Sequence, residues 1–233
     1  MSLDIDKYHL KSNSFFEFLS NEDISFVKTN MRRLEFKKKQ LLFREDSFSK
    51  GVYIIKKGKV KIYKTNPDGR ESIVYIYKKG DYFGYRPLLA NDPHPVSAGA
   101  IDNVVVSFIP IWVFNEVLEK SPQLAQKLLV NLSKEFSVWI NKITAFAHHS
   151  VKERVALSLL ILARVYERED STSKLIIISL NRNDFAGFVG TAKETLVRML
   201  RVFKDAKIIS ASGTKIIILK PKALEKLIEK YEP

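Results

Sequence analysis

The residues whose types and spacing could do chemistry gather in one stretch, residues 181–222, and most of them are cationic. This stretch holds nine Lys and Arg side chains against three acidic ones, a net charge of +6. Lysine and arginine at this density neutralise phosphates, and arginine can also bind a guanine through two hydrogen bonds. We therefore expect this stretch to face a nucleic acid.

The spacing within residues 181–207 predicts two helices joined by a tight turn. Asn181 is a suitable cap for a short helix over residues 182–189, and Gly190 would end that helix. Thr191 and Glu194 stand three residues apart and match a capping box, so a second helix is expected to start there. Two helices joined by a glycine turn are typical of a helix-turn-helix. The apolar residues expected in the shared core are Phe185, Val189, Leu196, Leu200 and Phe203.

The opposite face of the second helix carries the side chains that could read bases. It presents Lys193, Glu194, Val197, Arg198, Arg201 and Lys204. The first residues of such a helix enter the major groove, where arginine binds guanine and glutamate accepts from cytosine N4. The alternatives are that Glu194 serves only the capping box and that Arg198 is a plain surface charge. Lys204 and Lys207 are expected to be solvated or to bind phosphates.

A hairpin is expected after these two helices, over the sequence IISASGTKIIIL at residues 208–219. Lys215 lies near its tip, where it could approach the nucleic-acid backbone. The hairpin is a candidate wing, and the alternative is that it only completes the fold.

Residues 33–110 predict a β-rich domain. Short runs rich in Val, Ile and Tyr are separated by glycines, and the clearest are residues 52–55, 59–64, 72–77 and 104–109. The run KVKIYK alternates lysine with apolar side chains, as a half-buried strand does. Asn-Pro-Asp-Gly at 66–69 is a turn sequence. Many short strands at regular spacing favour an antiparallel barrel or sandwich.

A long helix is expected over residues 122–147, with Pro122 at its first position. Its apolar residues recur every three or four positions in two overlapping stripes, a face too wide for one contact. One side could pack on the β-rich domain and the other on the same helix of a second copy. The alternative is that the whole face is buried within one domain. The residues expected at the dimer interface are Ala125, Leu129, Leu132, Phe136, Ile140 and Ile143.

The composition excludes several classes of function. The 233 residues include no cysteine, which rules out disulfides, thiolate zinc sites and cysteine-ligated iron–sulfur clusters. No signal peptide and no apolar run of membrane-spanning length is found, so we expect a cytoplasmic protein that does not contact a membrane. No phosphate loop, metal-ligand spacing or nucleophile motif is present, so an enzyme is not expected.

The sequence resembles the Crp/Fnr family of bacterial transcription regulators over about residues 20–222. The most specific match is DFAGFVGTAKETLVRMLRVFKDAKIIS, and the second is VYIIKKGKVKIYKTNPDGRESIVYIYKKGDYFG, similar to a cyclic-nucleotide-binding β-roll. In the family, the positions of Lys193, Glu194 and Arg198 read bases, and Lys193 replaces the more usual arginine. The resemblance implies an α+β fold with an N-terminal antiparallel, jelly-roll-like β-roll, a long dimerisation helix and a C-terminal winged helix-turn-helix.

The resemblance fails at the ligand pocket. Cyclic-nucleotide binders of the family have a glutamate for the ribose where this chain has Tyr85, and an arginine for the phosphate where it has Val96. A valine cannot neutralise a phosphate. Gly84, Arg86 and Ser97 complete the candidate effector pocket, for which we expect some ligand other than cyclic AMP, or none. Four histidines remain as haem ligands in principle and are expected at the surface or a hinge: His9, His94, His148 and His149.

These expectations combine into a homodimeric, sequence-specific regulator that binds an inverted repeat in double-stranded DNA. Residues 1–149 would form the sensor domain with the dimerisation helix, and residues 150–233 the DNA-binding domain. RNA polymerase is an expected partner if the protein is an activator. The alternative is a nucleotide-sensing or protein-binding module whose basic domain contacts a protein partner. The residues expected to contact DNA are Asn181, Thr191, Lys193, Glu194, Thr195, Arg198, Arg201 and Lys215.

Overall fold

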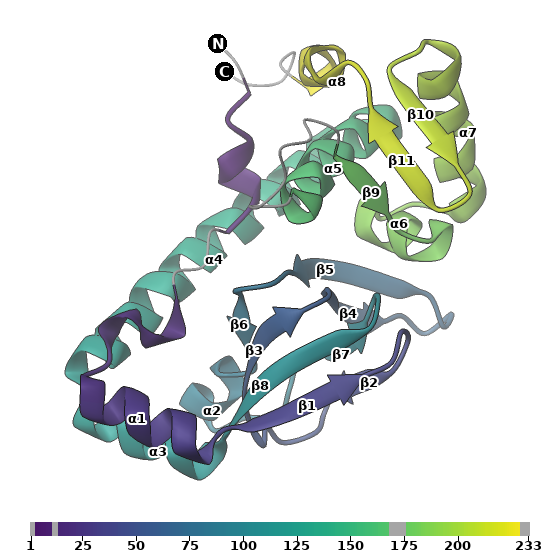
Figure 1. The fold of residues 1–233 in the computed structure, drawn as a ribbon. Helices are drawn as coiled ribbons and strands as arrows, with labels where there is room; N and C mark the ends of the chain where they lie inside the picture. Colours follow the sequence, from purple (N-terminus) through teal and green to yellow (C-terminus); the bar gives the residue numbers. More distant parts are fainter. Residues whose placement is uncertain (1–2, 11–13, 168–175, 229–233) are drawn as a thin grey trace. The chain divides into compact units, whose positions relative to one another are not determined.

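The computed structural model describes residues 3–10, 14–167 and 176–228 of the chain (Figure 1). By their internal packing these residues divide into two compact units. The roll unit comprises residues 14–69 and 73–135, and the C-terminal unit comprises residues 3–10, 70–72, 136–167 and 176–228. The long helix α4, Pro122–His148, contributes to both units.

Strands β1 to β8 form two four-stranded sheets, with the strand orders β1-β8-β3-β6 and β2-β7-β4-β5. The four runs singled out in the sequence correspond to strands, except that Lys59 lies just before its strand. Gly69 adopts a φ of 78° in the turn between β4 and β5, as the turn sequence predicts. The strand bounds are β1 Arg32–Phe36, β2 Leu41–Phe43, β3 Gly51–Lys57, β4 Val60–Thr65, β5 Glu71–Tyr77, β6 Tyr82–Phe83, β7 Ser97–Ala100 and β8 Val104–Pro110.

Aromatic side chains fill the interior of the roll. Tyr77 of β5 and Phe83 of β6 stack with their ring centroids 5.1 Å apart, although their strands belong to different sheets. The two sheets therefore enclose one core. The unit also contains η2 Phe15–Phe18, α1 Asn21–Asn30, α2 Arg86–Ala90 and α3 Ile111–Lys120.

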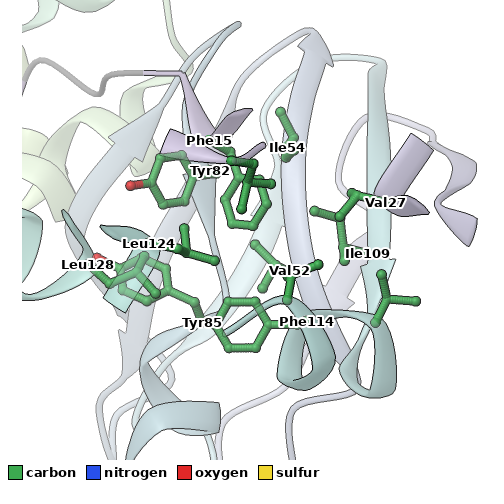
Figure 2. Close-up of a cluster of buried hydrophobic side chains, with 13 residues drawn as sticks. Phe15, Val27, Val52, Ile54, Tyr82, Tyr85, Ile109, Phe114, Leu124 and Leu128 are labelled. Atoms are coloured by element: carbon green, nitrogen blue, oxygen red, sulfur yellow. The ribbon is translucent and has the colours of Figure 1, made fainter. Parts of the chain in front are cut away.

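A second apolar cluster attaches the start of α4 to the roll (Figure 2). Leu124 and Leu128 of α4 are each 1% exposed and belong to the same cluster as Tyr82 and Tyr85. Burial of two leucine side chains contributes about 3–6 kcal/mol of hydrophobic stabilisation. One face of α4 is thus fixed against the roll before any second copy of the chain is considered.

The C-terminal unit is built around α5, Val151–Tyr166, whose middle is almost entirely buried. A capping box starts this helix, because the Ser150 N–H donates to Glu153 Oε2 at 2.8 Å and Ser150 Oγ accepts from the Glu153 N–H. The unit further contains η1 Ile5–Tyr8, β9 Ile177–Ser179, α6 Arg182–Val189, α7 Lys193–Asp205, β10 Ile209–Ser212, β11 Lys215–Ile218 and α8 Pro221–Ile228.

A buried lysine lies where α4 meets α6 within this unit. The Nζ atom of Lys142 is 4.3 Å from the centroid of the Phe188 ring, a cation–π contact. Burial disfavours the charged ammonium and lowers the pKa of Lys142 to about 8. The side chain therefore holds its charge in the interior at an electrostatic cost.

Candidate functional site

Helices α6 and α7 meet in a tight turn, as the sequence predicts. Asn181 caps α6 by accepting the N–H of Asp184 at 2.9 Å, and Gly190 ends it in the left-handed conformation with a φ of 67°. The side-chain amide of Asn181 also donates to the Asp184 carboxylate, so both ends of this side chain are used in the cap. The five residues expected in the shared core are all buried: Phe185, Val189, Leu196, Leu200 and Phe203.

The predicted capping box at Thr191 is wrong. The N-cap of α7 is Ala192, and no side chain bonds the first turn of the helix. The Thr191 N–H instead donates to the Ala186 carbonyl at 3.1 Å, so Thr191 still belongs to the end of α6. The Glu194 carboxylate is consequently not used as a helix cap, and the alternative that it serves only this role is removed.

The outward face of α7 is solvent-exposed and rich in charge. Lys193, Glu194 and Arg198 are exposed and form no ion pair with any residue that the structure describes. Arg201 is also exposed, and its ion pair with Asp205, 3.9 Å long at the surface, contributes little. Thr191 and Thr195 are half-buried beside this face.

The expected hairpin is present as β10 and β11, and Lys215 stands exposed at the start of β11, opposite Ser212. Its turn is attached to α6 by a residue that sequence reasoning counted only as charge. Arg182 Nη2 donates to the Gly213 carbonyl at 2.8 Å, and burial lowers the pKa of this guanidinium. Nothing in the local sequence distinguishes Arg182 from the cations that face solvent.

Helix α4 presents a stripe of exposed apolar side chains. In the single chain, Leu129, Phe136 and Ile143 are 63%, 65% and 65% exposed. Ile140 is also exposed, whereas Ala125 and Leu132 are half-buried. Four large apolar side chains in one line on a helix are characteristic of an interaction surface.

Residues of the candidate effector pocket bind other side chains of the same chain. Tyr85 lies in the hydrophobic cluster of Figure 2 and is 1% exposed, and its hydroxyl donates to Glu135 Oε1 of α4 at 3.3 Å. Arg86 Nη1 lies 3.5 Å from the other oxygen of the same carboxylate. Burial raises the pKa of Glu135, while the nearby Arg86 opposes this shift. Glu135 was not anticipated, although a carboxylate in line with Leu124 and Leu128 is a signal that could have identified it.

The other pocket residues also have partners. Ser97 Oγ accepts the N–H of Glu45 at 2.9 Å, and the carbonyl of Gly84 accepts from Ser49 Oγ at 3.0 Å. Val96 is half-buried. The pocket positions therefore contain no unpaired cation of the kind that a buried phosphate requires.

The expectation of surface or hinge histidines is wrong for two of the four. His9 and His94 are 5% and 3% exposed. His94 stacks on Phe43 with ring centroids 3.7 Å apart, and burial lowers its pKa to about 4. Within the described ranges, no three His, Asp or Glu side chains are grouped closely enough to hold a metal ion. In those same ranges, no helix combines the length and apolar character needed to cross a membrane.

Comparison with known proteins identifies both parts of the chain. Residues 33–121 match the cyclic nucleotide-binding domain, and residues 153–227 match the Crp-like helix-turn-helix domain. The chain is 27% identical over 188 residues to the fumarate and nitrate reduction regulatory protein of Vibrio cholerae, covering 81% of this chain and 75% of that one. It is 26% identical over 204 residues to the transcriptional activator protein Anr of Pseudomonas protegens, covering 87% and 83%.

Structural similarity supports the same fold. The structure of FixK2 from Bradyrhizobium japonicum superimposes with a TM-score of 0.75 at 24% identity, covering 84% of this chain and 96% of that one. The two domain matches together span more than half of the sequence. The cyclic nucleotide-binding domain comes first and the helix-turn-helix domain second, as the β-roll and the helix-turn-helix do in the structure. The chain therefore belongs to the Crp/Fnr family of DNA-binding transcription regulators.

Proposed function

We propose that this regulator acts as a homodimer that binds an inverted repeat in double-stranded DNA, with one α7 helix in each of two successive major grooves. Lys193, Glu194 and Arg198 read base edges. Thr191, Thr195, Arg201 and Lys215 bind phosphates, and Asn181 contributes by capping α6. Residues 1–149 serve as sensor and dimerisation domain, and residues 150–233 as the DNA-binding domain.

The observation that carries this proposal is the outward face of α7. Its three candidate base readers are exposed and unpaired among the described residues, so they can bind DNA without first breaking an ion pair. Arginine binds guanine O6 and N7 through two hydrogen bonds, and glutamate accepts from cytosine N4. Lysine at position 193 supplies a single ammonium in place of a planar fork, which favours a less directional contact.

The exposed stripe of α4 supports the dimer. Pairing of two α4 helices about a two-fold axis would bury Leu129, Phe136, Ile140 and Ile143 of both copies. A two-fold dimer presents its reading helices in opposite senses, about 34 Å apart, which is one turn of DNA. The operator is therefore expected to be an inverted repeat.

The match to a cyclic nucleotide-binding domain supports a small-molecule effector, and we propose that this effector is not cyclic AMP. Val96 offers no charge to a phosphate, and Arg86 already faces the buried Glu135 carboxylate. A cyclic nucleotide would have to displace Arg86 from Glu135, which would leave a buried carboxylate without its cation.

Selection of bound duplexes from a random pool tests the proposal. The full-length protein is expected to enrich an inverted repeat whose half-sites are centred about one helical turn apart. Arg198→Ala should lose the preference at one base pair of each half-site, and Lys204→Ala, an exposed cation farther along the same helix, serves as the control. Enrichment of no sequence at low salt would refute the proposal and favour a protein partner for the basic domain.

A further inference from the structure

One apolar side chain stands among the charges of the reading helix. Val197 is 46% exposed, three residues after Glu194 and four before Arg201. The face of α7 that packs in the core is formed by Leu196, Leu200 and Phe203, so the interior of the unit does not require Val197. Valine also has a lower helix propensity than lysine, glutamate or alanine, so its presence does not stabilise an exposed helix position.

The position of Val197 on the helix is that of a base reader. At about 100° per residue, its side chain projects inside the arc bounded by Lys193 and Arg198. A second exposed valine on the same helix, Val202, is 42% exposed. Val202 projects outside that arc and lies more than one turn farther from the N-terminal end of α7. The two valines therefore differ in their direction and in their position along the helix, and not in their chemistry or exposure.

The chemistry of valine restricts what it can recognise in the major groove. Its side chain has no hydrogen-bond donor or acceptor, so it cannot pair with the polar edges of guanine, cytosine or adenine. Thymine alone among the DNA bases presents a methyl group there. A valine in a helix is held in one preferred rotamer, so it loses little conformational freedom when it makes contact.

We propose that Val197 is a specificity-determining residue that packs against the C5-methyl group of one thymine in each half-site. This inference rests on the proposed function, in which the start of α7 lies in the major groove. It adds to the polar readout by Lys193, Glu194 and Arg198 an apolar contact that selects a base through its methyl group alone.

Replacement of thymine by deoxyuridine tests the contact, because it removes only the methyl group and keeps the pairing edges. Each thymine of the selected operator is replaced in turn, symmetrically in both half-sites, and dissociation constants are measured for the full-length protein. For the wild type we expect one thymine position at which deoxyuridine lowers the affinity about fourfold for each half-site, which corresponds to the loss of one buried methyl group. At that position Val197→Ala should show less than a twofold effect.

Val202→Ala is the matched control, and it should retain the full deoxyuridine effect. Because both valines are exposed, both variants should remain folded, which circular dichroism and thermal unfolding would verify. The inference is overturned if no thymine responds in the wild type, or if Val197→Ala shows the same loss as the wild type. If an operator is selected and either result is found, the proposed function stands without this contact. If no operator can be selected, the proposed function fails and this inference falls with it.

Discussion

Phe136 is the position at which we expect a single substitution to separate the two copies of the dimer. Its side chain lies at the middle of the α4 stripe and is 65% exposed in the single chain. Phe136→Asp replaces an apolar surface with a carboxylate. On a two-fold axis the change occurs twice in each dimer, so its effect is doubled.

The size of the effect follows from the exposed area. A phenylalanine side chain offers roughly 200 Å² for burial, so the exposed two thirds correspond to about 130 Å². At about 25 cal/mol per Å², its burial in the interface contributes ~3 kcal/mol for each protomer, and ~6 kcal/mol for the dimer. The dissociation constant should therefore rise by at least about four orders of magnitude, before the cost of burying two carboxylates is added.

Sedimentation velocity at micromolar concentration measures this change directly. The wild type should sediment as a dimer and Phe136→Asp as a monomer, with unchanged far-ultraviolet circular dichroism. Lys134→Asp is the matched control, because Lys134 is exposed on α4 but projects away from the stripe, and it should remain dimeric. If Phe136→Asp sediments like the wild type, the interface lies elsewhere and the argument from the stripe is refuted.

Three further predictions concern DNA, ligand and pH. Arg198→Ala should cost about 1–3 kcal/mol of binding free energy for each half-site and relax the preference at one base pair. Lys215→Ala should instead lower the affinity for all DNA sequences evenly and flatten the salt dependence of the affinity by about one for each half-site. Titrations of operator and scrambled DNA at several salt concentrations distinguish the two. Calorimetry with millimolar cyclic AMP or cyclic GMP should detect no binding, and micromolar binding that also tightens the operator complex would contradict our view of Val96 and Arg86. Burial lowers the folded-state pKa of Lys142 from 10.5 to about 8. The free energy of unfolding should therefore decrease as the pH falls from about 10.5 to 8, and Lys142 should cause no further change below pH 8. Lys142→Met should remove this dependence, worth up to about 3 kcal/mol, and urea denaturation at pH 8 and pH 10 checks it.

Periodicity and turn chemistry predicted the larger elements of the fold. The runs around Val52, Val60 and Val104 have the β-branched composition of strands, and Pro122 marks the first residue of α4. Strand β7, by contrast, is Ser-Ala-Gly-Ala, residues 97–100. All four of its residues are buried, so it has neither the alternation nor the large side chains that identify a strand in a sequence.

The candidate site was predictable where a residue acts through its own type and spacing. The exposed cations of α7 are of this kind, because the helix period alone separates them from Leu196 and Leu200. The roles of Glu135 and Arg182 could not be predicted in this way, because each depends on a partner that is distant in the sequence. Glu135 accepts a hydrogen bond from Tyr85, and Arg182 donates one to Gly213. The misassigned cap at Thr191 has a local cause: the turn after Gly190 uses one residue more than a capping box allows.

The length of α4 gives it the mechanics of a lever. Its 27 residues form an unbroken rod about 40 Å long, and Leu124, Leu128 and Glu135, which contact the roll, all lie in the first half of that rod. A change of about 10° in the direction of the helix beyond Glu135 would move its last residue, about 20 Å farther along, by roughly 3.5 Å, close to the rise of one base pair. Small rearrangements around the Glu135 carboxylate would therefore be magnified into a displacement on the scale at which neighbouring base pairs are distinguished.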